Sequence, residues 1–169
     1  IDSELLYDRV KDWTFGHRGK DFYLDVESRK NSITYRNTIS RLVEALINER
    51  KFDKAEEMLD LSFHKMPIED YENYGVCLGF PEQYYLINKP EKARKAANIL
   101  IKVFQEQLLY YSKFNSKDLS YLFSDIQTQF QMYRTIKIDI DKYDTDEDYK
   151  NKVAQAFESH IEMFETLFE

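Results

Sequence analysis

Apolar residues recur along most of the chain at the spacing of an α-helix. The clearest stripe lies between residues 33 and 48 and consists of Ile39, Leu42, Val43, Leu46 and Ile47. Intervals of three and four residues place all five on one helix face. A second stripe spans 53–66 and stops at Pro67. Two helices joined by about five residues must run antiparallel, so the pattern predicts a helical hairpin.

Similar stripes predict further helices in the rest of the chain. They cover the N-terminal segment to about Gly16, a short stretch after Pro81, and residues 90–112, 115–138 and 145–169. Polar residues at helix boundaries predict the caps: Ser3, Asp53 with Glu56, Asn115 or Ser116, and Thr145 at N-termini, and Asn48 at a C-terminus. Together the stripes predict an all-α fold of about six helices in antiparallel pairs.

The segment before residue 33 has the weakest helical pattern. It contains "GHRGKDFYLDVESRK", with two glycines and the extended run "FYLDV", which favours a loop or a short strand-like segment. Trp13 is expected to anchor this segment on the helices. We therefore expect one domain, made of an N-terminal segment in 1–32, helical hairpins in 33–112 and a C-terminal helical pair in 113–169.

The hairpin around Pro67 has features of a tetratricopeptide unit, a 34-residue pair of helices that stacks with its neighbours. Ala55 and Leu59 occupy the small and large positions of the second helix, and Ala93 recurs 38 residues after Ala55. Arg50 stands where that repeat has its turn glycine. The pattern favours a right-handed tetratricopeptide-like stack, and a hairpin without repeat ancestry stays open as the alternative.

Stacked helix pairs form a concave groove that binds partners. On the first helix the groove face would carry Asn37, Ser40, Glu44 and Asn48. These residues include no Lys or Arg, so a clamp for a peptide's terminal carboxylate is not expected. The sequence predicts a protein or peptide partner for this face without identifying it.

Four tyrosines form a second candidate contact surface: Tyr71, Tyr74, Tyr84 and Tyr85. A tyrosine ring offers an apolar face and a polar tip, which suits contacts with peptides or sugars. The alternative interpretation is that these rings pack between the hairpins.

Composition and motifs argue against several other functions. A net charge of −7 and a pI near 5.1 disfavour nucleic-acid binding, and the apolar runs are too short and too charged to span a bilayer. His17, His64 and His160 have no metal-ligand spacing, and the acidic stretch "DIDKYDTDED" lacks the Gly and Glu of a calcium loop. The single Cys77 carries no nucleophile signature. We therefore expect no catalytic residue, metal site or cofactor.

Several motifs occur in an order that resembles a known family. They are "WTFG", "FYLDVESR", "YRNTISRLVEALINERKFDKAEEMLD" with Pro67 after it, and "QYYLINKPEKA". Over Leu6 to about Tyr111 the chain is similar to the C-terminal soluble region of bacterial multi-pass membrane proteins that carry the domain of unknown function 2723. That family is related to protein O-mannosyltransferases. The chain departs from the pattern at Arg50, where the family has Gly, and beyond Tyr111.

The resemblance implies a location and a role. Glycosyl transfer would belong to a membrane-embedded part preceding this piece, and the piece itself would be a non-catalytic tail on the periplasmic side of the inner membrane. It would bind an acceptor protein or aid assembly. Two alternatives stay open: an independent sugar-binding module or hydrolase that uses Tyr and carboxylate side chains, and a helical bundle that forms homodimers.

Overall fold

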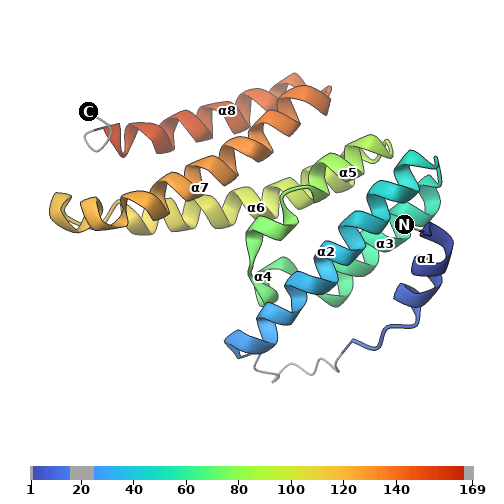
Figure 1. Cartoon of the computed structure of the whole chain (residues 1–169). Coiled ribbons are helices and arrows are strands. Elements are labelled where there is room, and N and C mark those ends of the chain that lie inside the picture. Colours follow the sequence, from blue (N-terminus) through green and yellow to red (C-terminus); the bar gives the residue numbers. More distant parts are fainter. Residues whose placement is uncertain (1, 16–24, 166–169) are drawn as a thin grey trace. The chain divides into compact units, whose positions relative to one another are not determined.

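The computed structural model describes residues 2–15 and 25–165, which fold almost entirely as helices (Figure 1). Within these ranges the chain forms eight α-helices, α1 to α8, and one short 3-10 helix, and no strand occurs there. The predicted all-α class is confirmed. Contacts between Cα atoms divide the chain into unit 1, Ile1–Lys89, and unit 2, Pro90–Glu169. The expected single domain with limits after residues 32 and 112 stays a prediction.

Unit 1 is built around a hairpin of two long helices, as the apolar stripes predict. α2 spans Val26–Asn48 and α3 spans Phe52–Lys65, and the two lie side by side in Figure 1. The predicted stripe of α2 is buried, apart from the half-buried Ile47. The facing stripe of α3 is buried at Ala55, Met58, Leu59 and Ser62. Burying an aliphatic side chain contributes about 1.5–3 kcal/mol, so this seam supplies much of the stability of unit 1.

α2 begins at Val26, earlier than the predicted start near Ile33. Asp25 caps it, because its carboxylate accepts a hydrogen bond from the Ser28 backbone N–H at 2.9 Å. The expected strand-like run "FYLDV" is therefore wrong at its end, where Asp25 caps the helix and Val26 is helical. Its first three residues lie outside the described ranges.

α1, Ser3–Lys11, packs on α2 through Tyr7 and Val10. Its N-cap is Asp2, which accepts from the Leu5 N–H at 3.0 Å, so the prediction of Ser3 as the cap is wrong. Ser3 is instead buried, and its hydroxyl donates to Glu49 at 2.6 Å. This contact ties the start of α1 to the end of α2.

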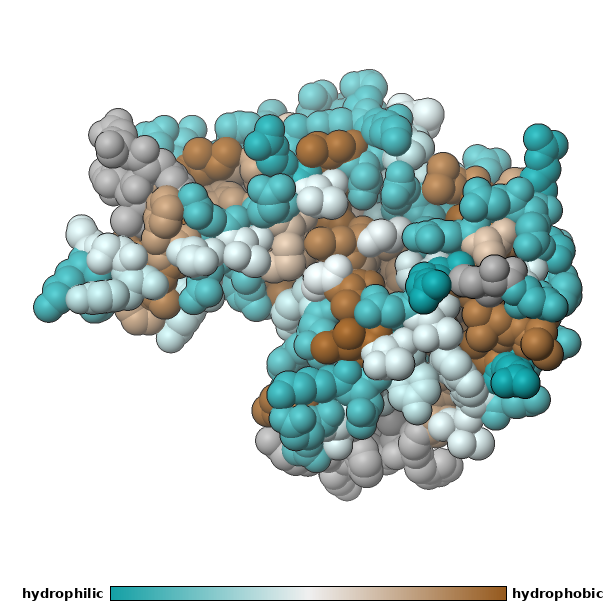
Figure 2. Space-filling view, in the orientation of Figure 1, coloured by the Kyte–Doolittle hydropathy of each residue, from teal (hydrophilic) through white to brown (hydrophobic). Residues whose placement is uncertain are grey.

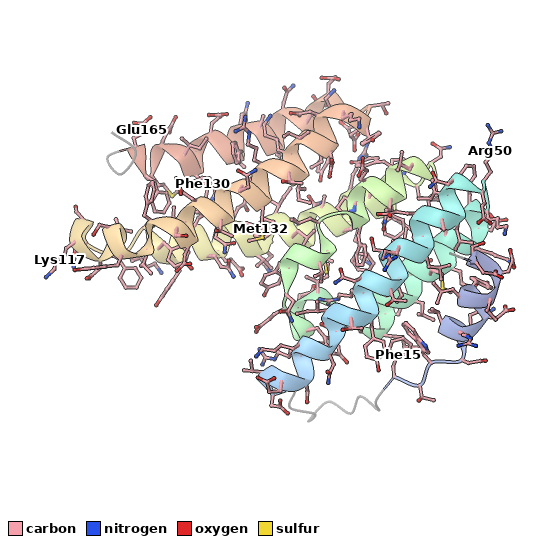
Figure 3. The ribbon with its side chains drawn as sticks, in the orientation of Figure 1. Phe15, Arg50, Lys117, Phe130, Met132 and Glu165 are labelled. Atoms are coloured by element: carbon pink, nitrogen blue, oxygen red, sulfur yellow. The ribbon has the colours of Figure 1, made fainter. Side chains whose placement is uncertain are left out.

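Trp13 anchors the residues that follow α1, as predicted. Its ring meets the ring of Tyr35 on α2 edge to face, with centroids 5.0 Å apart. Phe15, labelled in Figure 3, lies 6.3 Å from the same Tyr35 ring. Aromatic pairs of this geometry add about 0.5–1.5 kcal/mol beyond the area they bury, so both rings hold the segment against α2.

The turn between α2 and α3 is centred on Arg50, which Figure 3 labels at the end of the hairpin. Arg50 has φ 59°, the left-handed conformation, so the prediction that Asn48 takes this role is wrong. The Lys51 N–H donates to the Leu46 carbonyl at 2.8 Å, and the Arg50 N–H donates to the Ile47 carbonyl at 2.9 Å. This Schellman-type ending is the one that normally uses glycine.

The connection before α6, Pro90–Tyr111, repeats that ending 38 residues later. Asn88 has φ 59°, and the Lys89 N–H donates to the Tyr84 carbonyl at 2.9 Å. Ala55 follows the first of these turns and Ala93 follows the second at the same distance. Both alanines are fully buried. The predicted recurrence is therefore visible in the backbone as well as in the sequence. The right-handed tetratricopeptide stack is compatible with these helices and stays a prediction.

Arg50→Gly is expected to stabilise the protein by about 0.5–1 kcal/mol, because glycine adopts the left-handed conformation without steric cost. Asn88→Gly is the matched variant, and its gain should be smaller because asparagine tolerates this conformation. Urea denaturation followed by circular dichroism measures both. A loss of stability in Arg50→Gly would contradict this account of the turn.

Two further expectations about unit 1 are corrected. Lys51 stands at the N-cap of α3 and makes no side-chain capping bond, so the predicted capping box of Asp53 and Glu56 does not form. The linker stretch "IEDYENYGVCLG" after Pro67 favours an irregular loop, but it contains α4, Ile68–Tyr71, and a 3-10 helix, Tyr74–Cys77. α5, Phe80–Leu86, follows with Pro81 in its first turn, as predicted.

Arg36 of α2 holds that linker in place. Its side chain is fully buried, and its guanidinium donates to the backbone carbonyls of Glu72, Met66 and Pro67 at 2.6, 3.0 and 3.3 Å. Tyr71 lies over the guanidinium, 5.8 Å away. One side chain thus donates to backbone carbonyls on both sides of α4, where few backbone N–H groups are placed to do so.

Unit 2 consists of three helices: α6, Pro90–Tyr111, α7, Ser116–Tyr143, and α8, Glu147–Glu162. Its core includes Leu100, Phe104, Tyr133 and Ile136, in agreement with the stripes. The apolar stripe of the first turns of α7 predicts burial of Leu119, Leu122 and Phe123, but the three are only half-buried. Asn115 caps α7, as expected, and accepts from the Asp118 N–H at 3.1 Å.

The acidic stretch before α8 is largely helical, which corrects the expected loop. α7 continues to Tyr143, and Asp146 rather than Thr145 caps α8, accepting from the Tyr149 N–H at 3.0 Å. Asp144 is buried between the helices, and its two oxygens accept from Arg94 of α6 at 2.7 and 2.6 Å. An ion pair therefore fastens the α7–α8 turn to α6.

Cys77 is expected to be unreactive in the folded protein. It is fully buried in unit 1, and burial raises the pKa of its thiol to about 11. At pH 8 roughly one molecule in a thousand would then carry the reactive thiolate. Titration with a thiol reagent should find one reactive group in denaturant and almost none in buffer. Rapid labelling in buffer would show that unit 1 opens readily around the 3-10 helix.

Candidate functional site

A groove of about 250 Å³ lies between α2 and α5 in unit 1, and we call it the α2–α5 groove. It is lined by Ser40, Glu44, Ile47, Asn48, Gly79, Glu82, Gln83 and Leu86. The lining combines amide, hydroxyl and carboxylate groups with two aliphatic side chains. Such a mixture can hydrogen-bond a peptide backbone and cover its apolar side chains.

α2 supplies the residues that the sequence predicts for a partner-binding face. Ser40, Glu44 and Asn48 recur at four-residue steps, so they share one helix face, and all three line the groove. Asn37 lies one turn earlier on the same face and is exposed, but it is not part of the lining. The structure therefore brings three of these four residues together at one depression.

α5 supplies the opposite wall. Gly79 precedes the helix in a right-handed conformation and Pro81 starts it. Gln83 then projects toward α2, where its side-chain amide donates to the Ser40 hydroxyl at 2.9 Å and to the Ser40 carbonyl at 3.2 Å. These two bonds fix the Gln83 amide at the groove. The sequence pattern did not single out this residue.

The carbonyl oxygen of Gln83 is buried beside the groove. The residue is 4% exposed, and within the described chain no donor reaches its Oε1. A buried acceptor without a partner costs about 1–3 kcal/mol, so this oxygen is a cost of placing Gln83 at the wall of the groove. Gln107 and Gln129 also have buried carbonyl oxygens of this kind, but they line neither groove described in this chain.

The charged residues that line the α2–α5 groove are acidic. Its lining contains Glu44 and Glu82 and no Lys, Arg or His. α2 ends at the groove with Ile47 and Asn48 and carries no basic residue in its last turn. The carboxyl end of a helix carries partial negative charge, so it adds to the field of the carboxylates.

The candidate tyrosines do not form one exposed surface. Tyr84 is 3% exposed, donates to Asp60 at 2.9 Å and packs against Phe63, and Tyr85 is 9% exposed. Burial raises the pKa of the Tyr84 phenol, and the nearby Asp60 carboxylate adds to the rise. These two rings therefore pack within unit 1, which corrects the expected contact role and favours the alternative. Tyr71 ends α4 and Tyr74 begins the 3-10 helix, and both are half-buried and lie outside the groove lining.

A larger depression of about 810 Å³ lies between α7 and α8 in unit 2. Phe130, Ile138, Phe157 and Ile161 form its apolar part, with Arg134 and Lys137 beside them. Figure 3 shows Phe130 between the two helices, and Figure 2 shows hydrophobic surface there next to hydrophilic residues. Phe130, Phe157 and Ile161 lie on the apolar stripes of their helices, which predict burial in a core. The stripes do not predict this depression, because it depends on the separation of the two helices.

Neither of the two histidines that the structure describes lines one of the grooves. His64 lies beside the apolar stripe of 53–66, a place that favours packing, but it is exposed. His160 Nδ1 hydrogen-bonds with the Ala156 carbonyl of its own helix at 2.6 Å. His17 lies outside the described residues. In the described ranges no group of three or more His, Cys, Asp or Glu side chains gathers closely enough to hold a metal ion.

Two further observations concern the whole molecule. None of the helices in the described segments combines the length and the apolar character that crossing a membrane requires. Comparisons of this chain with protein-family models, with curated proteins and with solved structures gave no match.

Proposed function

We propose that the chain is a non-catalytic protein-interaction domain whose α2–α5 groove binds a segment of a partner protein. The observation that carries this proposal is the groove lining. Ser40, Glu44 and Asn48, which the helical pattern assigns to a partner-binding face, meet the fixed amide of Gln83 there. Carboxamide and hydroxyl groups can both donate and accept, which matches the alternating N–H and C=O groups of an extended peptide.

The resemblance in the sequence supports a context for this role. We propose that the domain is the periplasmic tail of a multi-pass membrane protein related to glycosyltransferases, and that its ligand belongs to an acceptor protein or to an assembly partner. The order of "WTFG", "FYLDVESR" and the hairpin motif supports this context. Topology reporters fused to the full-length gene product test it, and a cytoplasmic reporter signal would contradict it.

The proposed role of the groove can be tested by selecting peptides that bind the chain and by filling the groove with a larger side chain. A library of short peptides displayed on phage is selected against the purified chain, and the affinity of a selected peptide is measured by calorimetry. Gly79→Leu should weaken binding at least tenfold, which corresponds to about 1.4 kcal/mol. A side-chain carbon at Gly79 meets no atom within 4 Å, and its backbone is right-handed, so the variant fills the groove without disturbing the fold.

Gly75→Leu is the matched control. A side-chain carbon there also meets nothing within 4 Å, and Gly75 does not line the groove. It should leave the affinity unchanged. If selected peptides bind Gly79→Leu as well as the natural chain, or if repeated selection yields no peptide, the proposed function fails.

A further inference from the structure

We infer that the depression between α7 and α8 is the contact surface of a homodimer, in which α7 of each copy lies in the depression of the other copy. The inference goes beyond the proposed function, because the α2–α5 groove belongs to unit 1 and this depression belongs to unit 2. Three features of the depression support it: an apolar floor that is open to solvent, room for a helix, and one unpaired charge of each sign.

The floor of the depression is an aromatic cluster. Phe130 of α7 meets the rings of Phe157 and Phe164 edge to face, with centroids 6.1 and 5.7 Å apart, and is itself only half-buried. On the walls, Ile138 of α7 is 52% exposed and Ile161 of α8 is half-buried. Apolar surface that stays open on both walls of a depression is typical of a site that another protein surface covers.

The depression has the size of a short stretch of helix. A helix with its side chains is about 10 Å wide and rises about 5.4 Å in each turn, so one turn fills about 420 Å³. The volume of about 810 Å³ therefore has room for about two turns. Phe130, Arg134 and Ile138 follow one another at four-residue steps and form a ridge along α7. With that ridge of each copy in the depression of the other, the two α7–α8 hairpins form a four-helix bundle.

The charges at the depression favour a second copy over an acidic or a basic partner. Arg134 on α7 and Glu158 on α8 are both exposed, and neither makes an ion pair within the ranges that the structure describes. Lys137, the other charged residue of the lining, is already paired with Asp141 at 2.7 Å. An acidic partner would satisfy Arg134 but would meet Glu158, and a basic partner would do the reverse. In a two-fold interface residue i contacts residue j and j contacts i, so Arg134 of each copy can meet Glu158 of the other.

Sedimentation velocity of the full chain tests the inference. Between roughly 1 μM and 1 mM, the natural chain should change from a species of 20.4 kDa, the mass of one chain, to a species of twice that mass. Ile138→Glu should raise the dissociation constant of the dimer at least about tenfold, since each dimer would bury two new carboxylates. Leu109→Glu is the matched control, because Leu109 is 48% exposed on α6 and lies outside the depression. This variant should dimerise as the natural chain does.

Charge reversal tests the pairing across the two-fold axis. Arg134→Glu alone and Glu158→Arg alone should each weaken the dimer at least about tenfold, because like charges then meet at both contacts. A mixture of the two variants should form heterodimers as readily as the natural chain forms homodimers, because opposite charges meet again at both contacts. Both substituted residues are exposed, so the circular dichroism spectra of the variants should match the spectrum of the natural chain.

Three results would overturn the inference: a natural chain that stays monomeric over the whole concentration range, a dimer that Ile138→Glu and Leu109→Glu affect equally, or a mixture of the two charge variants that stays monomeric. If the chain is a monomer and a display-selected peptide shifts the NMR signals of α7 and α8, the depression binds a segment of another protein instead of a second copy. Loss of peptide binding in Gly79→Leu is a separate result, because it concerns unit 1 and does not depend on dimerisation.

Discussion

Arg36→Met should lower the free energy of unfolding by about 3 kcal/mol. The guanidinium of Arg36 is fully buried and donates to the carbonyls of Met66, Pro67 and Glu72. Methionine fills much of the same volume but donates nothing, so these acceptors would lose their charged donor. A buried acceptor left unsatisfied costs about 1–3 kcal/mol, and removal of a well-bonded buried charge is among the largest effects of single substitutions.

Urea denaturation measured by circular dichroism gives this value, with Arg41→Met as the matched control. Arg41 lies on the same helix and is exposed, so its replacement should change stability by less than about 0.5 kcal/mol. Arg36→Lys should also destabilise, since an ammonium cannot reach carbonyls on both sides of α4 as the fork of a guanidinium does. A stability of Arg36→Met equal to that of Arg41→Met would contradict the role given to Arg36.

Asp144→Asn should destabilise the protein by a similar amount, about 3 kcal/mol. The Asp144 side chain is fully buried, and its two oxygens accept from the Arg94 Nε and Nη2 at 2.7 and 2.6 Å. Its Oδ1 also accepts from the Asp146 N–H at 2.9 Å. Asparagine keeps the shape but turns one acceptor into a donor. That donor would face either Arg94 or the Asp146 N–H, and the buried charge pair would be broken.

A double-mutant cycle measures the interaction energy between Arg94 and Asp144 separately from the other contacts of the two residues. Arg94→Met is combined with Asp144→Asn, and the coupling energy should be at least about 1.5 kcal/mol in favour of the natural pair. Asp125→Asn, an exposed carboxylate of α7, serves as the control and should be nearly neutral. Additive effects of the two substitutions would show that the bidentate contact contributes little.

The helices were predictable because they depend on local spacing. The stripes from Ile39 to Leu46 and from Ala55 to Ser62 are buried where the pattern places them. Boundaries were less predictable, because several residues near each end can act as the cap. Asp2 and Asp146 cap α1 and α8, each one residue away from the predicted Ser3 and Thr145. Arg50 adopts a left-handed conformation in spite of its side chain, since the packing of α2 on α3 fixes the turn.

Part of the candidate site was also predictable. One face of α2 indicated Ser40, Glu44 and Asn48, but the opposite wall required the position of α5, which no local pattern gives. Arg36 did leave a signal in the sequence. It lies three residues before Ile39 on the buried face of α2, where an arginine is unusual and indicates a specific set of buried acceptors.

The measurement that tests the central claim most directly is an NMR map of a display-selected peptide on the natural chain. The account predicts that the backbone amides of residues 44–48 and 79–86 shift together with the side-chain amide of Gln83, and that Gly79→Leu removes these shifts. If instead the shifts fall on α7 and α8 around Phe130, or on residues outside both grooves, the α2–α5 groove is not the binding site and the account is contradicted.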